Sequence, residues 1–102
     1  MSEQFLQTCL SLFKLDLGIT HNLRDVLFLN LLKSSSIELT KMGVDLSKET
    51  AEDIQLIVDY SLWQYRKRQD DVGLPRNLQF KIHNRVIQKV GETNAKPETE
   101  SE

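Results

Sequence analysis

The fold is decided by residues 59–90, DYSLWQYRKRQDDVGLPRNLQFKIHNRVIQKV. The first part of this stretch continues a helical pattern and ends in the basic residues 66–68, and an acidic connector, residues 70–74, follows. In the connector, Gly73 permits a left-handed residue. Pro75 suits the first position of a new helix, because its missing N–H is not needed there. The stretch therefore predicts two helices joined by a sharp turn.

The helix after the turn is predicted to run from Pro75 to Val90 and to end at Gly91. Apolar residues recur at every fourth position, at Leu78, Ile82, Val86 and Val90. A short β-strand at Leu78–Ile82 is an alternative, since polar and apolar residues also alternate there. The starting proline and the later period of four favour the helix.

The helix before the turn is predicted to start near Asp45–Ser47, with Ser47 or Thr50 as its N-cap. Acidic residues in the first turn and basic residues in the last turn match the helix dipole. The expected inward face consists of Ala51, Ile54, Ile57, Val58, Ser61, Leu62 and Tyr65. The residues expected outside or at the edges are Glu52, Asp53, Gln55, Asp59, Arg66 and Lys67.

Two further helices are predicted upstream. The first spans Glu3–Leu15, with Ser2 as N-cap and Gly18 as its end. The second spans Thr20–Met42, with Thr20 or Asn22 as N-cap and Gly43 as its stop. Its stretch VLFLNLL, residues 26–32, is apolar nearly all round, which is typical of a central helix covered by neighbours. One face of it contains Leu23, Val26, Leu27, Asn30, Leu31 and Ser34.

The sequence thus predicts an all-α protein, a small bundle of about four helices with a disordered acidic C-terminal tail. Residues 1–91 form the helical domain. Residues 92–102 are polar, show no apolar periodicity and contain Pro97, so we expect them to be disordered in the free protein. The triple serine at 34–36 lowers helix propensity and permits a bend, a break or the close approach of another backbone.

The composition restricts the possible functions. The 102 residues carry a net charge of −2 and a pI near 5.7, which argues against a dedicated nucleic-acid binder. The single cysteine, Cys9, lies in an apolar stretch and is expected to be buried and inert. No apolar run is long enough for a membrane span, and the N-terminal MSEQ shows no secretory signal.

No catalytic motif is visible, so we expect no enzyme, no metal and no cofactor. His21 and His83 are far apart and lack further ligands at metal-binding spacing. Asp70 and Asp71 are a possible carboxylate pair, but a solvated turn among basic residues explains them better.

A local basic cluster contains residues 66–68 with Arg76, Lys81 and Arg85. It has three interpretations: phosphate contact with DNA, matching of the helix dipole with pairing to acidic neighbours, or binding to an anionic protein surface. Trp63 packs in the core or lies in a subunit interface, where tryptophan is enriched. The candidate partner-binding residues are Trp63, Arg66, Lys67, Arg68, Arg76, Arg85 and Lys96.

The C-terminal half carries a resemblance to a known family. The pattern VDYSLWQYRKR (58–68), then DDVGLPRNL (70–78) and the final NRV (84–86), resembles the head–tail connector proteins of long-tailed bacteriophages. These are the adaptor, or head-completion, proteins that bind below the portal. The similarity is clearest over residues 45–90, whereas the first helices agree in arrangement more than in residues.

The resemblance implies a structural virion protein. Such adaptors are helical and form a ring, typically of twelve copies, beneath the portal protein. The ring extends the DNA channel, which DNA passes without sequence-specific binding, and offers a docking surface to the stopper or tail-completion protein. We therefore expect this chain in the host cytoplasm during assembly and then at the head–tail interface of the virion, without a membrane. The tail, here residues 90–102, is expected to order on the portal.

An alternative function is a small helix-turn-helix DNA-binding regulator. The turn at 72–75 would join two helices, and Pro75–Val90 would be the recognition helix. Its residues Arg76, Asn77, Gln79, Lys81, Asn84 and Arg85 are types that contact base edges. The acidic pI, the long preceding helix and the acidic connector argue against it. A cytosolic adaptor or inhibitor of unknown target is a third possibility.

Overall fold

The computed structural model describes the backbone of residues 2–70 and 73–101 and the side chains of residues 2–67 and 73–88. The described residues form four helices and no strand: α1 (Glu3–Leu17), α2 (Asp25–Lys41), α3 (Ala51–Asp70) and α4 (Arg76–Ser101). The predicted all-α fold is confirmed. The strand alternative at Leu78–Ile82 is wrong, because these residues lie inside α4.

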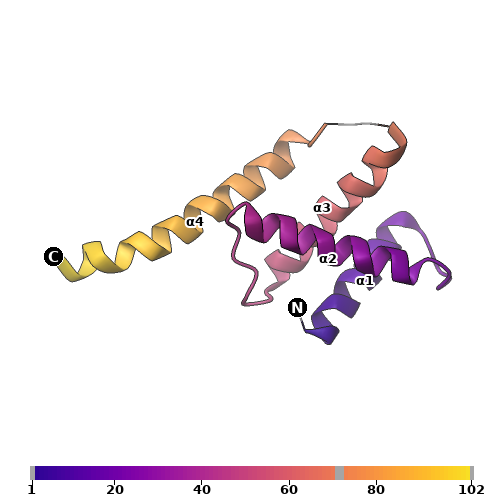
Figure 1. Cartoon of the computed structure of the whole chain (residues 1–102), viewed down its shortest axis with the longest axis horizontal. Helices are drawn as coiled ribbons and strands as arrows, with labels where there is room; N and C mark the ends of the chain where they lie inside the picture. The colour runs from indigo at the N-terminus through magenta and orange to yellow at the C-terminus, as the bar shows by residue number, and fades with distance from the viewer. Residues whose placement is uncertain (1, 71–72, 102) are drawn as a thin grey trace.

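Helix α3 is the central element of the bundle. Helices α1 and α2 pack against each other and on α3, and α4 packs on α3 after the turn. The C-terminal part of α4 extends away from the other three helices (Figure 1). This extension accounts for the longest dimension of the molecule, 56 Å, against 30 and 18 Å in the other directions.

The core lies between α1, α2 and α3, and three aromatic rings fill its middle. The ring of Phe13 lies 5.0 Å from that of Phe28 and 5.9 Å from that of Tyr65, and Phe28 and Tyr65 are 5.7 Å apart. Both pairs with Tyr65 meet edge to face, the arrangement that aromatic quadrupoles favour. Phe13 and Phe28 are fully buried, and the Tyr65 hydroxyl accepts a hydrogen bond from Arg24 at 3.2 Å. The expectation that Tyr65 fills the core is confirmed.

The inward face of α3 is mostly as expected. Ile57, Val58, Ser61 and Leu62 are buried, as the pattern predicts. The prediction is wrong for Ala51, which is exposed at the start of the helix. The buried face is wider than the pattern, because α1, α2 and α4 pack around α3 and cover Leu56 and Tyr60 as well.

The prediction for α2 is wrong in two respects. The face that packs inward contains Phe28, Leu32, Ser35 and Leu39, whereas Leu23 and Val26 on the expected face are 89% and 74% exposed. Helix α2 is therefore an outer helix. A helix that is apolar nearly all round leaves the choice of its buried face to the neighbours, and here α1 and α3 cover only one side.

The start of α2 also differs from the prediction. The helix begins at Asp25 rather than Thr20, and its N-cap residue, Arg24, makes no side-chain capping bond. The side chain of Asn22 is used elsewhere, since its Oδ1 accepts a hydrogen bond from Lys14 Nζ at 2.9 Å. The same ammonium pairs with Asp25 at 2.8 Å, which ties the end of α1 to the start of α2.

Of the other ends, the start and end of α1 and the end of α2 follow the sequence signals, whereas α3 starts at Ala51, after the predicted start near Asp45–Ser47. Ser2 caps α1 by accepting a bond from the Phe5 N–H, and Gly18 ends this helix in the left-handed conformation. Thr50, not Ser47, caps α3, and the Ser47 hydroxyl instead donates to Asp45 at 2.6 Å. Gly43, with a φ of 105°, follows the end of α2 as expected.

Gly18→Ala should lower the free energy of unfolding by about 1 kcal/mol, because an alanine is strained in the left-handed region. The backbone at Gly18 has a φ of 72°, and an added Cβ would meet no atom within 4 Å, so the cost is conformational rather than steric. Urea unfolding measures the change.

Gly73→Ala is the matched control for this substitution. The sequence permits a left-handed Gly73, but its φ lies outside that region, and an added Cβ would meet no atom within 4 Å. Alanine there should be neutral or stabilise by about 0.4–1 kcal/mol through the unfolded chain. Equal destabilisation by both substitutions would show that the left-handed backbone of Gly18 is not the cause of the loss.

The end of α4 differs from the prediction. The helical backbone continues past Gly91 and Pro97 to Ser101. A single glycine lowers helix propensity without ending a helix by itself, so Gly91 is not a sufficient stop. The expected disorder of residues 92–102 in the free protein stays a prediction.

Candidate partner-binding surfaces

The fold divides the basic cluster into paired and exposed residues. Arg85 on α4 forms an ion pair with Asp53 on α3 and donates a further hydrogen bond to the Asp45 carbonyl at 2.9 Å. The Asp53 side chain is only 1% exposed and that of Arg85 only 18%. The expectation that Asp53 faces outward is therefore wrong.

The reason for the burial of Asp53 is its double role at the start of α3. Its carboxylate accepts a hydrogen bond from the Thr50 N–H, and its own N–H donates to the Thr50 hydroxyl. This reciprocal capping box fixes the carboxylate beneath α4, where Arg85 neutralises it. The sequence pattern suggested that Arg85 contacts a binding partner. In the structure, its guanidinium joins α4 to α3 within the chain.

The remaining basic residues differ in their exposure. Lys81 pairs with Asp59 at 3.3 Å in a largely exposed bridge. Arg66, Lys67 and Arg76 are exposed. The side chains of Arg68 and Lys96, also proposed for partner contact, lie outside the described residues. The exposed basic residues therefore lie near the turn between α3 and α4.

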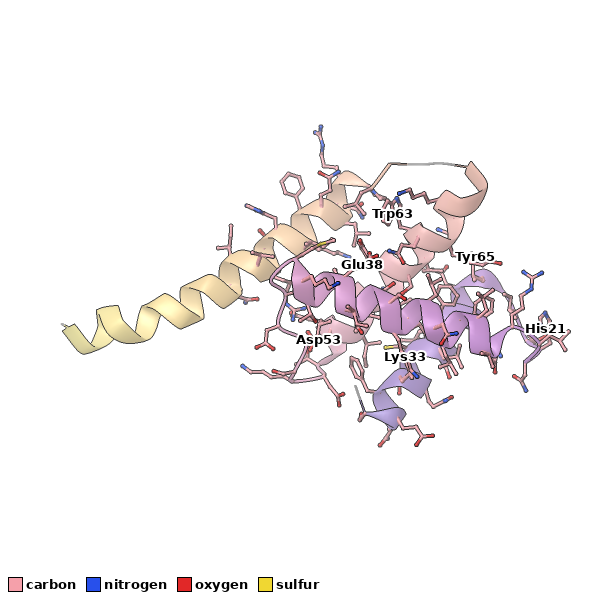
Figure 2. All side chains as sticks on the ribbon, in the orientation of Figure 1. His21, Lys33, Glu38, Asp53, Trp63 and Tyr65 are labelled. Carbon is pink, nitrogen blue, oxygen red and sulfur yellow. The ribbon has the colours of Figure 1, made fainter. Side chains whose placement is uncertain are left out.

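Trp63, the only tryptophan, is partly buried against the core and borders two grooves. One groove, of about 390 Å³, lies between α3 and the start of α4 and includes Pro75 and Leu78. The other, of about 580 Å³, lies between α2 and α3 and includes Glu38. Figure 2 shows the labelled side chains of Trp63 and Glu38 on these two helices. The expected contact of Trp63 with the core is confirmed, whereas its place in a subunit interface stays a prediction.

A polar network connects α2 with α3 below the second groove. The buried hydroxyl of Ser61 donates to that of Ser35 at 2.7 Å, and Ser35 donates to Gln64 Oε1 at 3.3 Å. Gln64 Nε2 and the Tyr60 hydroxyl both donate to Glu38 Oε2, at 2.6 and 2.8 Å. Sequence reasoning missed this network. The triple serine at 34–36, read there as permitting close backbone approach, was the one signal for it.

The network gives Tyr60 a defined proton state. Burial, the hydrogen bond to Glu38 and the negative charge of Glu38 together raise the pKa of Tyr60 to about 12. The phenol therefore stays a donor at neutral pH, and it holds the Glu38 carboxylate at the groove.

Glu49 fastens the start of α1 to the loop before α3. Its carboxylate accepts hydrogen bonds from the Ser2 N–H at 2.7 Å and the Ser2 hydroxyl at 2.9 Å. Glu49 itself has a φ of 50°, a left-handed conformation that is uncommon for residues other than glycine. The hydrogen bonds from Ser2 lower the pKa of Glu49 from its ordinary value of 4.5.

Glu49→Gln should remove one acid-dependent contribution to stability. Because the folded-state pKa is lowered, the carboxylate stabilises the fold above the unfolded-state value and loses this effect as pH falls through the folded-state value. Wild type should therefore exceed Glu49→Gln in thermal midpoint at pH 7, and the difference should shrink below about pH 4. Thermal unfolding of both proteins from pH 3 to pH 7 checks this. A difference independent of pH would contradict it.

The remaining candidate reactive groups have ordinary structural settings. Cys9 is fully buried, and this burial raises the pKa of its thiol to about 11, as expected for an inert cysteine. His21 and His83 are exposed. Among the residues whose positions are described, no cluster of three His, Cys, Asp or Glu side chains could hold a metal ion.

Exposed large apolar residues occur on α1, at Leu12 and Leu15, and on two further surfaces. The α2 surface consists of Leu23, just before α2, with Val26, Leu27 and Ile37, and the α4 surface consists of Phe80 and Ile87. Ile87 also borders a groove of about 490 Å³ between α3 and α4, together with Leu56 and Lys81. Scattered apolar residues are normal on a surface, but several on one helix face indicate an interaction site.

Comparisons with protein-family models, curated proteins and solved structures found no match. Within the part of the chain that the structure describes, no helix is both long and apolar enough to cross a membrane.

Proposed function

We propose that this chain is a structural subunit of a phage head–tail connector, an adaptor that joins the portal protein to the stopper or tail. The observation that carries the proposal is the presence of two unlike exposed apolar surfaces, the α2 surface and the α4 surface, on one small helical domain. Val26 is 74% exposed and Phe80 is 59% exposed.

A closed ring explains why one chain would have two such surfaces. Subunits in a ring meet through heterologous contacts, so each subunit needs two different patches that fit each other. The ring, with twelve copies as the expected number, would bind below the portal and extend the DNA channel. A strongly basic channel wall would hold DNA through its phosphates. We therefore assign Arg66 and Arg76 to contacts with a neighbouring subunit or the portal.

Co-sedimentation with portal-containing heads tests the function directly. Wild type should sediment with these heads and not with empty shells that lack the portal. Arg68→Glu combined with Arg76→Glu should reduce the bound fraction at least about tenfold, because reversed charges oppose a complementary surface. Lys48→Glu, which reverses an exposed charge in the loop before α3, is the control and should bind normally. Absence of wild-type binding would refute the adaptor function.

Deletion of residues 94–102 tests the role of the tail. The shortened chain should keep its helical bundle, since it retains every described core residue, from Phe5 to Val86, but its attachment to the portal should weaken. Normal attachment of the shortened chain would show that the tail is dispensable.

The DNA-binding alternative receives less support from the geometry. Of the side chains suited to base edges, Lys81 and Arg85 already pair with Asp59 and Asp53, and Gln79 donates to the Leu74 carbonyl at 2.8 Å. A gel shift with duplex DNA over a range of salt concentrations separates the two functions. Salt-sensitive binding by the isolated chain would favour the regulator.

A further inference from the structure

Glu38 presents a carboxylate at the open groove between α2 and α3, which Lys67 also lines. Both of its hydrogen bonds, from Tyr60 and Gln64, end on Oε2. Among the described residues, Glu38 takes part in hydrogen bonds but in no ion pair. It is half-buried and lines the groove between α2 and α3. The fixed negative charge therefore borders a space of about 580 Å³ that a ligand could enter.

The same groove has an aromatic wall that already attracts a cation. Lys67 places its ammonium 5.0 Å from the centre of the Trp63 ring, within the range of a cation–π contact. The Tyr60 ring lies 5.4 Å from that of Trp63, at an interplanar angle of 46°. Carboxylate and indole thus border one space, and each attracts positive charge.

We propose that the groove between α2 and α3 binds an arginine side chain of a protein partner. The groove is lined by Leu31, Ser34, Glu38, Tyr60, Trp63, Gln64 and Lys67. The guanidinium would stack on the Trp63 ring and donate hydrogen bonds to Glu38. The site goes beyond the adaptor function and does not depend on it.

Arginine fits this groove better than lysine does. A guanidinium is planar, so it can stack on an indole while its edge donates to a carboxylate. An ammonium is a compact, strongly hydrated charge that satisfies one of these contacts at a time, as Lys67 does on Trp63 without pairing with Glu38. Lys67 is then a competitor within the chain, and an arriving arginine displaces it from the ring.

Trp63 is also the reporter for the test, because it is the only tryptophan. The full chain is titrated with the capped peptide Gly-Gly-Arg-Gly-Gly at low ionic strength while tryptophan fluorescence is recorded. A single side chain should give a saturable change with a dissociation constant on the order of 1 mM. The same peptide with citrulline, which is neutral and nearly isosteric, should bind at least about tenfold more weakly.

Two substitutions separate this site from a general charge effect. Glu38→Gln should weaken binding of the arginine peptide about tenfold, whereas Glu52→Gln, which removes an exposed carboxylate outside the groove, should leave it unchanged. Lys67→Gln should strengthen binding several-fold, because it removes the competing ammonium. If Glu38→Gln fails to fold, binding by Lys67→Gln and binding of the citrulline peptide still test the proposal.

Three results would overturn the proposal. These are equal binding of the citrulline peptide, unchanged binding by folded Glu38→Gln, and weaker rather than stronger binding by Lys67→Gln. Binding of a glutamate peptide in place of the arginine peptide would assign the surface to an anionic partner. The outcome is independent of co-sedimentation with heads, so either proposal can fail without the other.

Discussion

Arg85→Met should lower the free energy of unfolding by about 3–5 kcal/mol, the range observed when one partner of a buried ion pair is removed. The carboxylate of Asp53 is 1% exposed, and Arg85 is the cation paired with it. Methionine retains much of the length and apolar contact of arginine but supplies no charge. The hydrogen bond to the Asp45 carbonyl is lost as well.

Urea unfolding followed by circular dichroism measures this loss. Lys81→Met is the matched control, because it also removes a cation of α4 paired with a carboxylate of α3. Its side chain is 52% exposed, so the cost should stay below about 1 kcal/mol. The double variant Asp53→Asn with Arg85→Met should recover part of the stability, since no buried charge remains unpaired. Equal costs for Arg85→Met and Lys81→Met would refute the structural role of the Asp53–Arg85 pair.

Phe13→Ala should lower the free energy of unfolding by about 3–5 kcal/mol, as for other buried phenylalanines. The ring of Phe13 is fully buried and contacts both Phe28 and Tyr65 at the meeting point of three helices. Its removal leaves a cavity and abolishes the ring contacts with Phe28 and Tyr65. Because small domains have total stabilities of about 5–15 kcal/mol, this variant should be close to unfolding at 37 °C.

Thermal unfolding compares this variant with Phe80→Ala. Phe80 is the same residue type but is 59% exposed on α4, so its removal should change stability by no more than about 0.5 kcal/mol. Phe80 also belongs to the α4 surface, so Phe80→Ala tests assembly without disturbing the fold. A large loss of stability in Phe80→Ala would mean that this surface is covered within the isolated chain.

Part of the candidate site follows from sequence patterns alone. Arg66, Lys67 and Arg76 were expected on a surface near the turn, and the structure exposes all three. The pattern could not separate them from Arg85, which has the same charge. Only the packing of α4 against the start of α3 brings Arg85 to Asp53 and removes it from the exposed set. The Glu38 network was not predictable, since its members come from two helices whose relative rotation the sequence does not show.

The sequence by itself determined the four helices and most of their ends. Local chemistry sets these features: Ser2 and Thr50 cap through their own neighbours, and Gly18 is left-handed at a place where an added Cβ would meet no atom within 4 Å. The pattern of residues 59–90 was sufficient to place the turn between α3 and α4, although Gly73 is not left-handed there.

The tertiary structure alone decided which face of α2 is buried and that Asp53 is buried. The stretch VLFLNLL, residues 26–32 of α2, is apolar nearly all round, so its own sequence is compatible with burial of either side. The contact with α1 and α3 selects Phe28 and Leu32 and leaves Leu23 exposed. Asp53 is buried for the same reason, because a distant residue, Arg85, neutralises its charge. A residue's burial depends on which partners the whole chain brings to it, and local patterns do not contain that information.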